Sequence, residues 1–141
     1  MTAREYLQQA RGMKLRLEAL EERRAFYRDM ASGRIARYKP GAGGGTRRVS
    51  SVEEYACKLA DLEADMARRV DAYVELVAEI EVVIDAVPDQ RYRDLLRFRY
   101  LNGWSWHKIA RRMGYQVESM YKMHDNALRF VHVPEKSTSK N

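Results

Sequence analysis

The pattern of apolar residues along the chain predicts an all-α protein. Between 51 and 87 the apolar positions recur at steps of three and four residues, the heptad-like spacing of one long, coiled-coil-like helix. A shorter stripe with similar spacing runs through 3–30, with an interruption at Arg24. The stripes consist of Ala10, Met13, Leu17, Leu20 and Tyr27, and of Tyr55, Leu59, Leu62, Met66, Val70, Tyr73, Val77, Ile80, Ile84 and Val87.

A single apolar seam needs a partner, so we expect an antiparallel helical hairpin over 1–87. The longer helix has a surplus of apolar surface, which the C-terminal part of the chain or another copy would cover. Because exposed apolar stripes seek partners, a homo-oligomer built through this hairpin is the expectation.

Residues 31–50 break both periodicities. The stretch is rich in glycine and contains Pro40, so we expect a loop, with the long helix starting near Ser51. Ser51 and Glu54 have the spacing of a capping box. The loop holds five basic residues and no acidic one, which makes Arg47 and Arg48 candidates for a flexible phosphate-binding arm. An exposed charged linker explains these residues equally well.

The segment 88–133 predicts a unit of three short helices. Pro88 is expected to end the long helix and to start the next one, which runs to Leu101. A last helix extends from about Val117 to Val131, with Met120, Met123, Ala127 and Leu128 on its inner side. The remaining tail, 134–141, is short and polar, and we expect it to be disordered.

The turn and capping residues between these helices are those expected of a helix-turn-helix. Asn102 and Gly103 form a turn dipeptide, and Ser105 stands where the N-cap of the middle helix belongs. Gly114 can end that helix because it tolerates a positive φ. In a helix-turn-helix the second helix usually enters the major groove of DNA.

These residues resemble region four of bacterial sigma factors, and more closely the sigma-like regulators of phages. The matching positions are 88–89, 95–100, 103–106, 109–115 and 127–128. The wider layout is similar to small phage proteins of the late-gene activator group, the RinA and ArpU type. The resemblance implies transcriptional control of phage or prophage genes in the cytoplasm of a bacterial host. The chain departs from the pattern at Gln116, where such domains commonly place Ser or Thr as the cap of the recognition helix.

The resemblance and the helical spacing together define a candidate DNA surface. The recognition helix is expected to expose Gln116, Glu118, Ser119, Tyr121, Lys122, His124, Asp125 and Arg129. Of these, Gln116, Ser119, Tyr121 and Lys122 lie in the first two turns, where base-reading side chains belong, and Arg129 lies at the far end. Arg111 and Arg112 close the preceding helix and are candidates to clamp phosphates. A solvated face on a purely structural bundle is the alternative for all of them.

Charge and composition narrow the function further. The net charge of +6 is divided into blocks of +2 over 1–30, +5 over 31–50, −7 over 51–87 and +6 over 88–141. Positive ends suit a polyanion, and the acidic middle does not. No apolar stretch of membrane-spanning length is present, and the lone Cys57 has no metal-ligand companions. We expect no catalytic site, no metal, no cofactor, no small-molecule substrate and no membrane partner.

The function expected from these observations is a sequence-specific regulator that binds double-stranded DNA. A second possibility is an interaction protein whose sigma-like unit contacts RNA polymerase or a phage protein. A third is a small terminase-type DNA-recognition subunit, which also joins a helix-turn-helix to an oligomerising hairpin. The fold alone does not separate the three.

Overall fold

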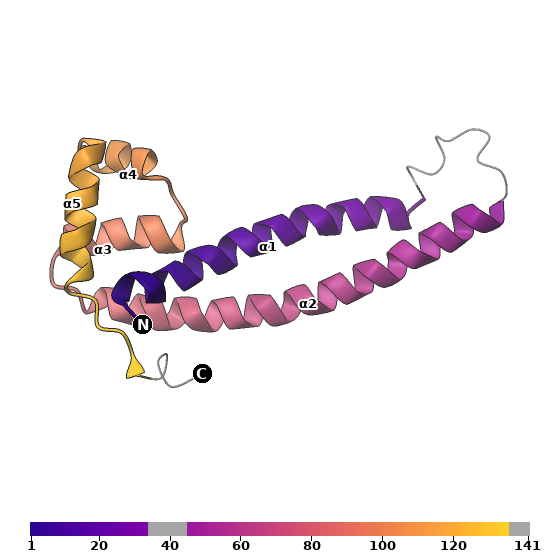
Figure 1. Cartoon of the computed structure of the whole chain (residues 1–141), viewed down its shortest axis with the longest axis horizontal. Coiled ribbons are helices and arrows are strands. Elements are labelled where there is room, and N and C mark those ends of the chain that lie inside the picture. The colour runs from indigo at the N-terminus through magenta and orange to yellow at the C-terminus, as the bar shows by residue number, and fades with distance from the viewer. Residues whose placement is uncertain (34–44, 136–141) are drawn as a thin grey trace. The chain divides into compact units, whose positions relative to one another are not determined.

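The computed structural model describes residues 1–33 and 45–135, and within these ranges every regular element is helical. In chain order the helices are α1 (Ala3–Ala31), α2 (Gly45–Asp85), α3 (Gln90–Leu96), the π-helical turn η2 (Arg97–Leu101), α4 (Trp106–Met113) and α5 (Val117–Leu128) (Figure 1). The predicted all-α class is confirmed, with two long helices followed by short ones.

The helices form two compact units, each of which contains a part of α1 and a part of α2. The first unit comprises Met1–Leu15 and Ala72–Asn141, and the second comprises Arg16–Asp71. This division differs from the boundary expected between 87 and 88. The reason is that the beginning of α1 and the end of α2 share one core with the short helices.

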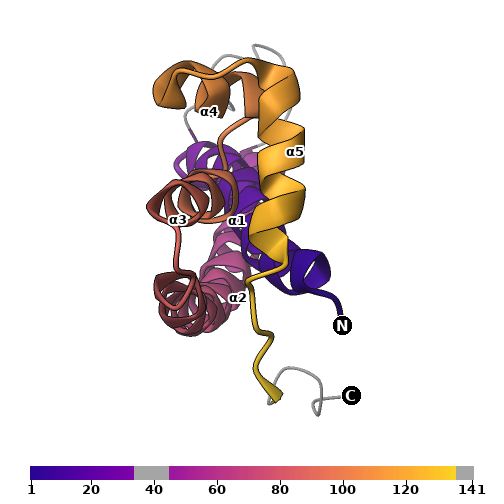
Figure 2. The same cartoon turned by 90° about the vertical axis from the view of Figure 1, so that its left-hand side faces the viewer.

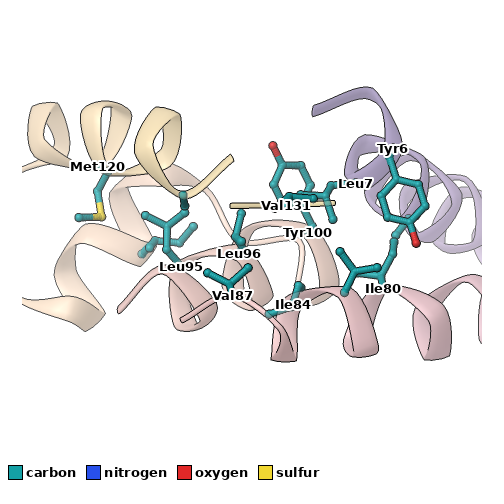
Figure 3. Close-up of a cluster of buried hydrophobic side chains, with 14 of the residues drawn as sticks. Tyr6, Leu7, Ile80, Ile84, Val87, Leu95, Leu96, Tyr100, Met120 and Val131 are labelled. Atoms are coloured by element: carbon teal, nitrogen blue, oxygen red, sulfur yellow. The ribbon is translucent and has the colours of Figure 1, made fainter. Parts of the chain in front are cut away.

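The core of the first unit draws on every helix. Its fully buried side chains come from α1 (Tyr6, Leu7), from α2 (Ile80, Ile84), from the segments after it (Val87, Leu95, Leu96, Tyr100) and from α4 and α5 (Ile109, Met120), as Figure 3 shows for most of them. Each large aliphatic side chain removed from water stabilises the fold by roughly 1.5–3 kcal/mol. The surplus of the long helix is therefore covered by the C-terminal part of the chain, one of the two expected arrangements.

A polar contact holds the start of α1 against α2 within this unit. The Tyr6 hydroxyl donates to Glu79 Oε1 at 2.7 Å. The first turns of α1 are thus fixed beside the short helices by both packing and a hydrogen bond, although the sequence pattern marked neither Tyr6 nor Leu7 as core.

The second unit has a thinner core. Met66 is its most enclosed apolar residue within the described ranges, at 8% exposure. Around it, Phe26, Tyr27 and Tyr55 form a cluster of rings with centroids 5.8–6.0 Å apart. Arg24, which interrupts the apolar stripe, bonds to Glu21 at 3.3 Å and lies 3.6 Å from Glu63. The interruption is therefore an ion-pairing position at the edge of the seam.

Several expected boundaries were wrong. The helix α2 begins at Gly45, so Ser51 lies inside it and does not form a capping box. Residues 46–50 contain no glycine or proline, so nothing in them stops the helix from extending back to 45. The expected loop 31–50 is thus shorter at both ends. The remainder of the loop and the tail from 136 lie outside the described residues.

The junction between α2 and α3 also differs from expectation. The helix α2 ends at Asp85, and Pro88 precedes α3 without being its first residue. The N-cap is Asp89, whose carboxylate accepts from the backbone N–H of Arg91 at 2.9 Å and pairs with its guanidinium. A side-chain acceptor can satisfy an orphan N–H at the helix start, which Pro88 cannot do.

The helix expected to reach Leu101 changes its hydrogen-bonding pattern after Leu96. The Asn102 N–H donates to the Arg97 carbonyl at 2.9 Å, a five-residue step that defines the π turn. Stacked rings of Phe98 and Trp104, with centroids 4.6 Å apart, stabilise this wider turn. The Trp104 N–H also donates to the Phe98 carbonyl at 3.0 Å.

Candidate nucleic-acid interface

The helix α4 has the two caps that the sequence predicted. The Ser105 side chain accepts a hydrogen bond from the Lys108 backbone N–H at 3.2 Å. At the other end Gly114 has a φ of 78°, and its N–H donates to the Ala110 carbonyl at 2.9 Å. Both ends of this eight-residue helix are therefore defined by local chemistry.

Helix α4 lies across the beginning of α5, the arrangement of a helix-turn-helix (Figures 1 and 2). Only 114–116 separate the two helices. Ile109 and Ala110 of α4 and Met120 of α5 belong to the same buried cluster. The N-cap of α5 is Gln116, whose side chain makes no capping hydrogen bond, in agreement with its weakness as a cap.

The outward face of α5 carries charges of both signs. Glu118, Lys122, Asp125 and Arg129 are all exposed and follow one another at steps of three and four residues. Asp125 is paired with Arg4 of α1, Oδ1 to Nη2 at 3.1 Å. Its charge is therefore partly offset from outside the helix.

Of the expected contact residues, Gln116, Ser119 and Lys122 are exposed at the start of α5. Tyr121 is 50% exposed, and its ring meets the ring of Trp106 edge-on with centroids 5.7 Å apart. Tyr121 thus has a packing role in addition to any contact it makes. Arg129 is exposed at the C-terminal end of the helix.

His124 was expected on this surface, and that expectation was wrong. The residue is 6% exposed, and its Nε2 lies 2.6 Å from the Tyr100 hydroxyl oxygen, with the Trp106 ring 4.7 Å away. Burial, followed by the positive charge of Arg4, lowers the pKa of His124 to about 4, and Asp125 opposes the shift. His124 is therefore a neutral core residue near pH 7.

The helix α4 presents a basic face. Lys108, Arg111 and Arg112 are exposed at steps of three and one, and α4 contains no acidic residue. The Lys108 ammonium and the Arg112 guanidinium lie over the Trp104 ring, 4.3 and 5.9 Å from its centroid. In the described part of the chain, none of the three basic side chains forms a salt bridge.

Lys108 did not figure among the expected contacts. The sequence spacing could have identified it. Lys108 precedes Arg111 by three residues and Arg112 by four, so it shares their face of the helix. Trp104 and Trp106 act as packing residues against the core of the first unit. Arg47 and Arg48 belong to the first turn of α2 and not to a loop, so the expectation of a flexible arm was wrong. Their side chains lie outside the described residues, and their contact with phosphate stays a prediction.

A hollow of about 470 Å³ lies along one flank of α5. It is lined by Arg91, Tyr92, Glu118, Ser119, Lys122, Met123 and Asn126. Ser119 and Lys122 therefore border a depression, to which α3 contributes Arg91. The arrangement groups polar and basic side chains from two helices on one side of α5.

No family model, curated protein or solved structure matches the chain. Within 1–33 and 45–135, no three or more His, Cys, Asp or Glu side chains are arranged to hold a metal ion. Over the same residues, no helix combines the length and the apolar character needed to cross a membrane.

Proposed function

We propose that the chain is a sequence-specific regulator of transcription that binds double-stranded DNA through α4 and α5. The observation that carries the proposal is the basic face of α4, set across the exposed start of α5. In helix-turn-helix proteins, the first helix of the motif contacts phosphates and the second contacts base edges in the groove. The resemblance of 88–131 to sigma region four extends the proposal to phage or prophage genes.

On α5, Lys122 and Ser119 are the side chains proposed to reach base edges. A lysine can donate to guanine, and a serine can donate or accept at any base. Glu118 can accept from the amino group of cytosine, so an acidic residue here does not oppose DNA recognition. Arg111, Arg112 and Lys108 are proposed to bind phosphates of the DNA backbone.

The test is to select duplexes from a random pool with the full chain and then to compare variants on the selected site. We expect Lys122→Ala to lose about 1–3 kcal/mol of binding free energy and to relax sequence preference. Tyr121→Phe keeps the ring on Trp106 and removes only the hydroxyl, so it isolates any polar contact. Lys58→Ala, an exposed lysine of α2, is the matched control.

Unchanged affinity and preference in both variants would remove α5 from the interface. If the pool yields no enriched sequence while binding persists, the sequence-specific part of the proposal fails and a nonspecific DNA binder remains.

A contact with RNA polymerase is the second candidate, and the alternating charges on α5 favour it. An outward face with Glu118, Lys122, Asp125 and Arg129 resembles the mixed polar rim of protein interfaces more than a purely cationic DNA surface. Titration of the full chain with RNA polymerase, with and without a selected duplex, distinguishes the two. Binding to polymerase that Lys122→Glu abolishes, in a chain that selects no duplex, would favour this candidate.

A further inference from the structure

The first turns of α1 place positive charges near the short helices of the first unit. Arg4, Arg11 and Lys14 follow at steps of seven and three residues, which places them along one side of the helix. Arg4 reaches Asp125 of α5. Lys14 lies against the turn before α4, its Cδ and Cε 3.5 Å from where a Cβ at Gly103 would stand.

Arg11 is near enough to a second arginine, Arg99, for its charge to act on it. Burial and then the charge of Arg11 lower the pKa of Arg99. Arg99 donates from Nη1 to the Trp104 carbonyl at 3.1 Å, and its guanidinium lies 4.4 Å from the centroid of the Trp106 ring. Among the described residues, neither Arg11 nor Arg99 has a carboxylate within salt-bridge distance.

Arg11 also carries an unused donor. Its Nε is buried and has no hydrogen-bond partner. A buried donor without an acceptor and two neighbouring cations without an anion both cost stability. An oxyanion bound beside the two guanidinium groups would relieve the second cost. The free chain is therefore less stable at this point than it would be with an oxyanion bound.

The space beside Arg99 is open and adjoins α5. A hollow of about 580 Å³ is lined by Arg4, Glu5, Gln8, Arg99, Tyr100, Trp106, Tyr121, His124 and Asp125. Two of the lining residues are acids. Asp125 is paired with Arg4, whereas Glu5 is exposed in the first turn of α1. Tyr121 connects the hollow to the start of α5.

We propose that Arg11, Lys14 and Arg99 bind backbone phosphates of the DNA strand that runs past the Tyr121 side of α5. This inference rests on the proposed function and deepens it, because it makes α1 a part of the DNA interface. Arginine forks match phosphate oxygens with two donors at once, and lysine adds a point charge. The negative charge of a phosphate also offsets the repulsion between Arg11 and Arg99.

The test uses two measurements on Arg11→Gln and Lys14→Gln in the full chain. The first is duplex affinity over a salt series, where each lost phosphate contact should lower the log–log slope by about one and weaken all sequences alike. The second is the melting temperature without DNA in a buffer free of phosphate. Arg11→Gln should melt higher than the wild type, because it removes a like charge from beside Arg99. Arg16→Gln, an exposed arginine of the same helix, is the control and should change neither measurement.

A lower slope together with a higher melting temperature supports the inference, because a purely structural role for Arg11 would lower the melting temperature. Slopes that stay at the wild-type value, in a chain whose α4 variants do lose slope, overturn this inference and leave the proposed function intact. A fall in melting temperature for Arg11→Gln overturns it as well. A wild-type chain that binds no duplex at all contradicts both the proposed function and this inference.

Discussion

His124 is the residue whose titration should be visible in the stability of the whole fold. Its pKa is lowered from 6.5 to about 4, mainly by burial. A lowered pKa in the folded state means that the unfolded chain binds the proton more readily. The stabilising effect is therefore complete above pH 6.5 and is lost as the pH falls towards 4.

We expect the free energy of unfolding to fall by on the order of 2 kcal/mol over this range, with a discount for the part of the ring that solvent screens. Urea denaturation between pH 7 and pH 4 measures this loss. In His124→Gln the part of the pH dependence that belongs to this residue should disappear. A variant with the same pH profile as the wild type would show that His124 is not the titrating group.

At this scale the two caps of α4 could be predicted from the sequence, but the burial of His124 could not. Ser105 and Gly114 were identified correctly because a cap depends on neighbours in the chain, which the sequence displays. His124 was misplaced because it lies at the edge of the apolar stripe, where helical spacing does not decide burial. Its partner, Tyr100, is 24 positions away and comes from another helix. Only the tertiary fold brings the two together.

Among the helices, α4 is the one whose proposed contacts with DNA phosphates can be tested most directly. We expect Arg111→Gln combined with Arg112→Gln to lower the log–log salt slope by about two, and the addition of Lys108→Gln to lower it by about one more. Glutamine keeps part of each aliphatic stem over the Trp104 ring, so the packing of α4 changes less than with alanine. Fluorescence anisotropy with a labelled duplex over a salt series gives the slope.

The control for this series is Arg23→Gln, an exposed arginine of α1 in the second unit. If the three α4 substitutions leave the slope as it is in the wild type, the basic face of α4 points into solvent in the complex.

A second element-scale prediction concerns the start of α5. Gln116 occupies the N-cap with extended backbone, at a φ of −72° and a ψ of 150°, but gives no side-chain hydrogen bond. A serine in the same backbone could accept from a free N–H of the first turn, so Gln116→Ser should stabilise the chain by about 0.5–1 kcal/mol. Thermal unfolding measures the gain. A loss of stability would mean that Gln116 makes contacts that its exposure does not suggest.

The number and type of the helices could be predicted from periodicity, but several of their limits could not. The start of α2 at Gly45 contradicted a plausible capping pair at Ser51 and Glu54. The π turn after Leu96 occurs together with the stacking of Phe98 on Trp104, a contact that helical spacing does not predict. The start of α2 and the π turn were therefore missed, while both ends of α4 were predicted.

On the scale of the whole molecule, the apolar seam of α2 is largely covered by other residues of the same chain. Every seam position from Tyr55 to Val87 is buried or half-buried except Val70, which is 42% exposed. The expectation of an oligomer rested on a seam left uncovered, so that reason for it no longer holds. Among the valines of α2 from Val52 onward, Val74 and Val82 are the most exposed, at 59% and 71%.

These valines have acidic neighbours, Asp71, Glu75 and Glu81. Two copies meeting through this face would bring like charges together. An oligomer of this chain therefore stays a prediction, for which sedimentation at tens of micromolar, with and without DNA, is the measurement.

The central claim is that α4 and α5, with the start of α1, receive double-stranded DNA. Amide chemical shifts of the labelled full chain, recorded during titration with a selected duplex, test it most directly. We predict that the shifted amides concentrate in 104–122, with a second group in 4–14, and that 52–70 stay unchanged. Shifts centred on 52–70, or none at saturating DNA, would contradict the account.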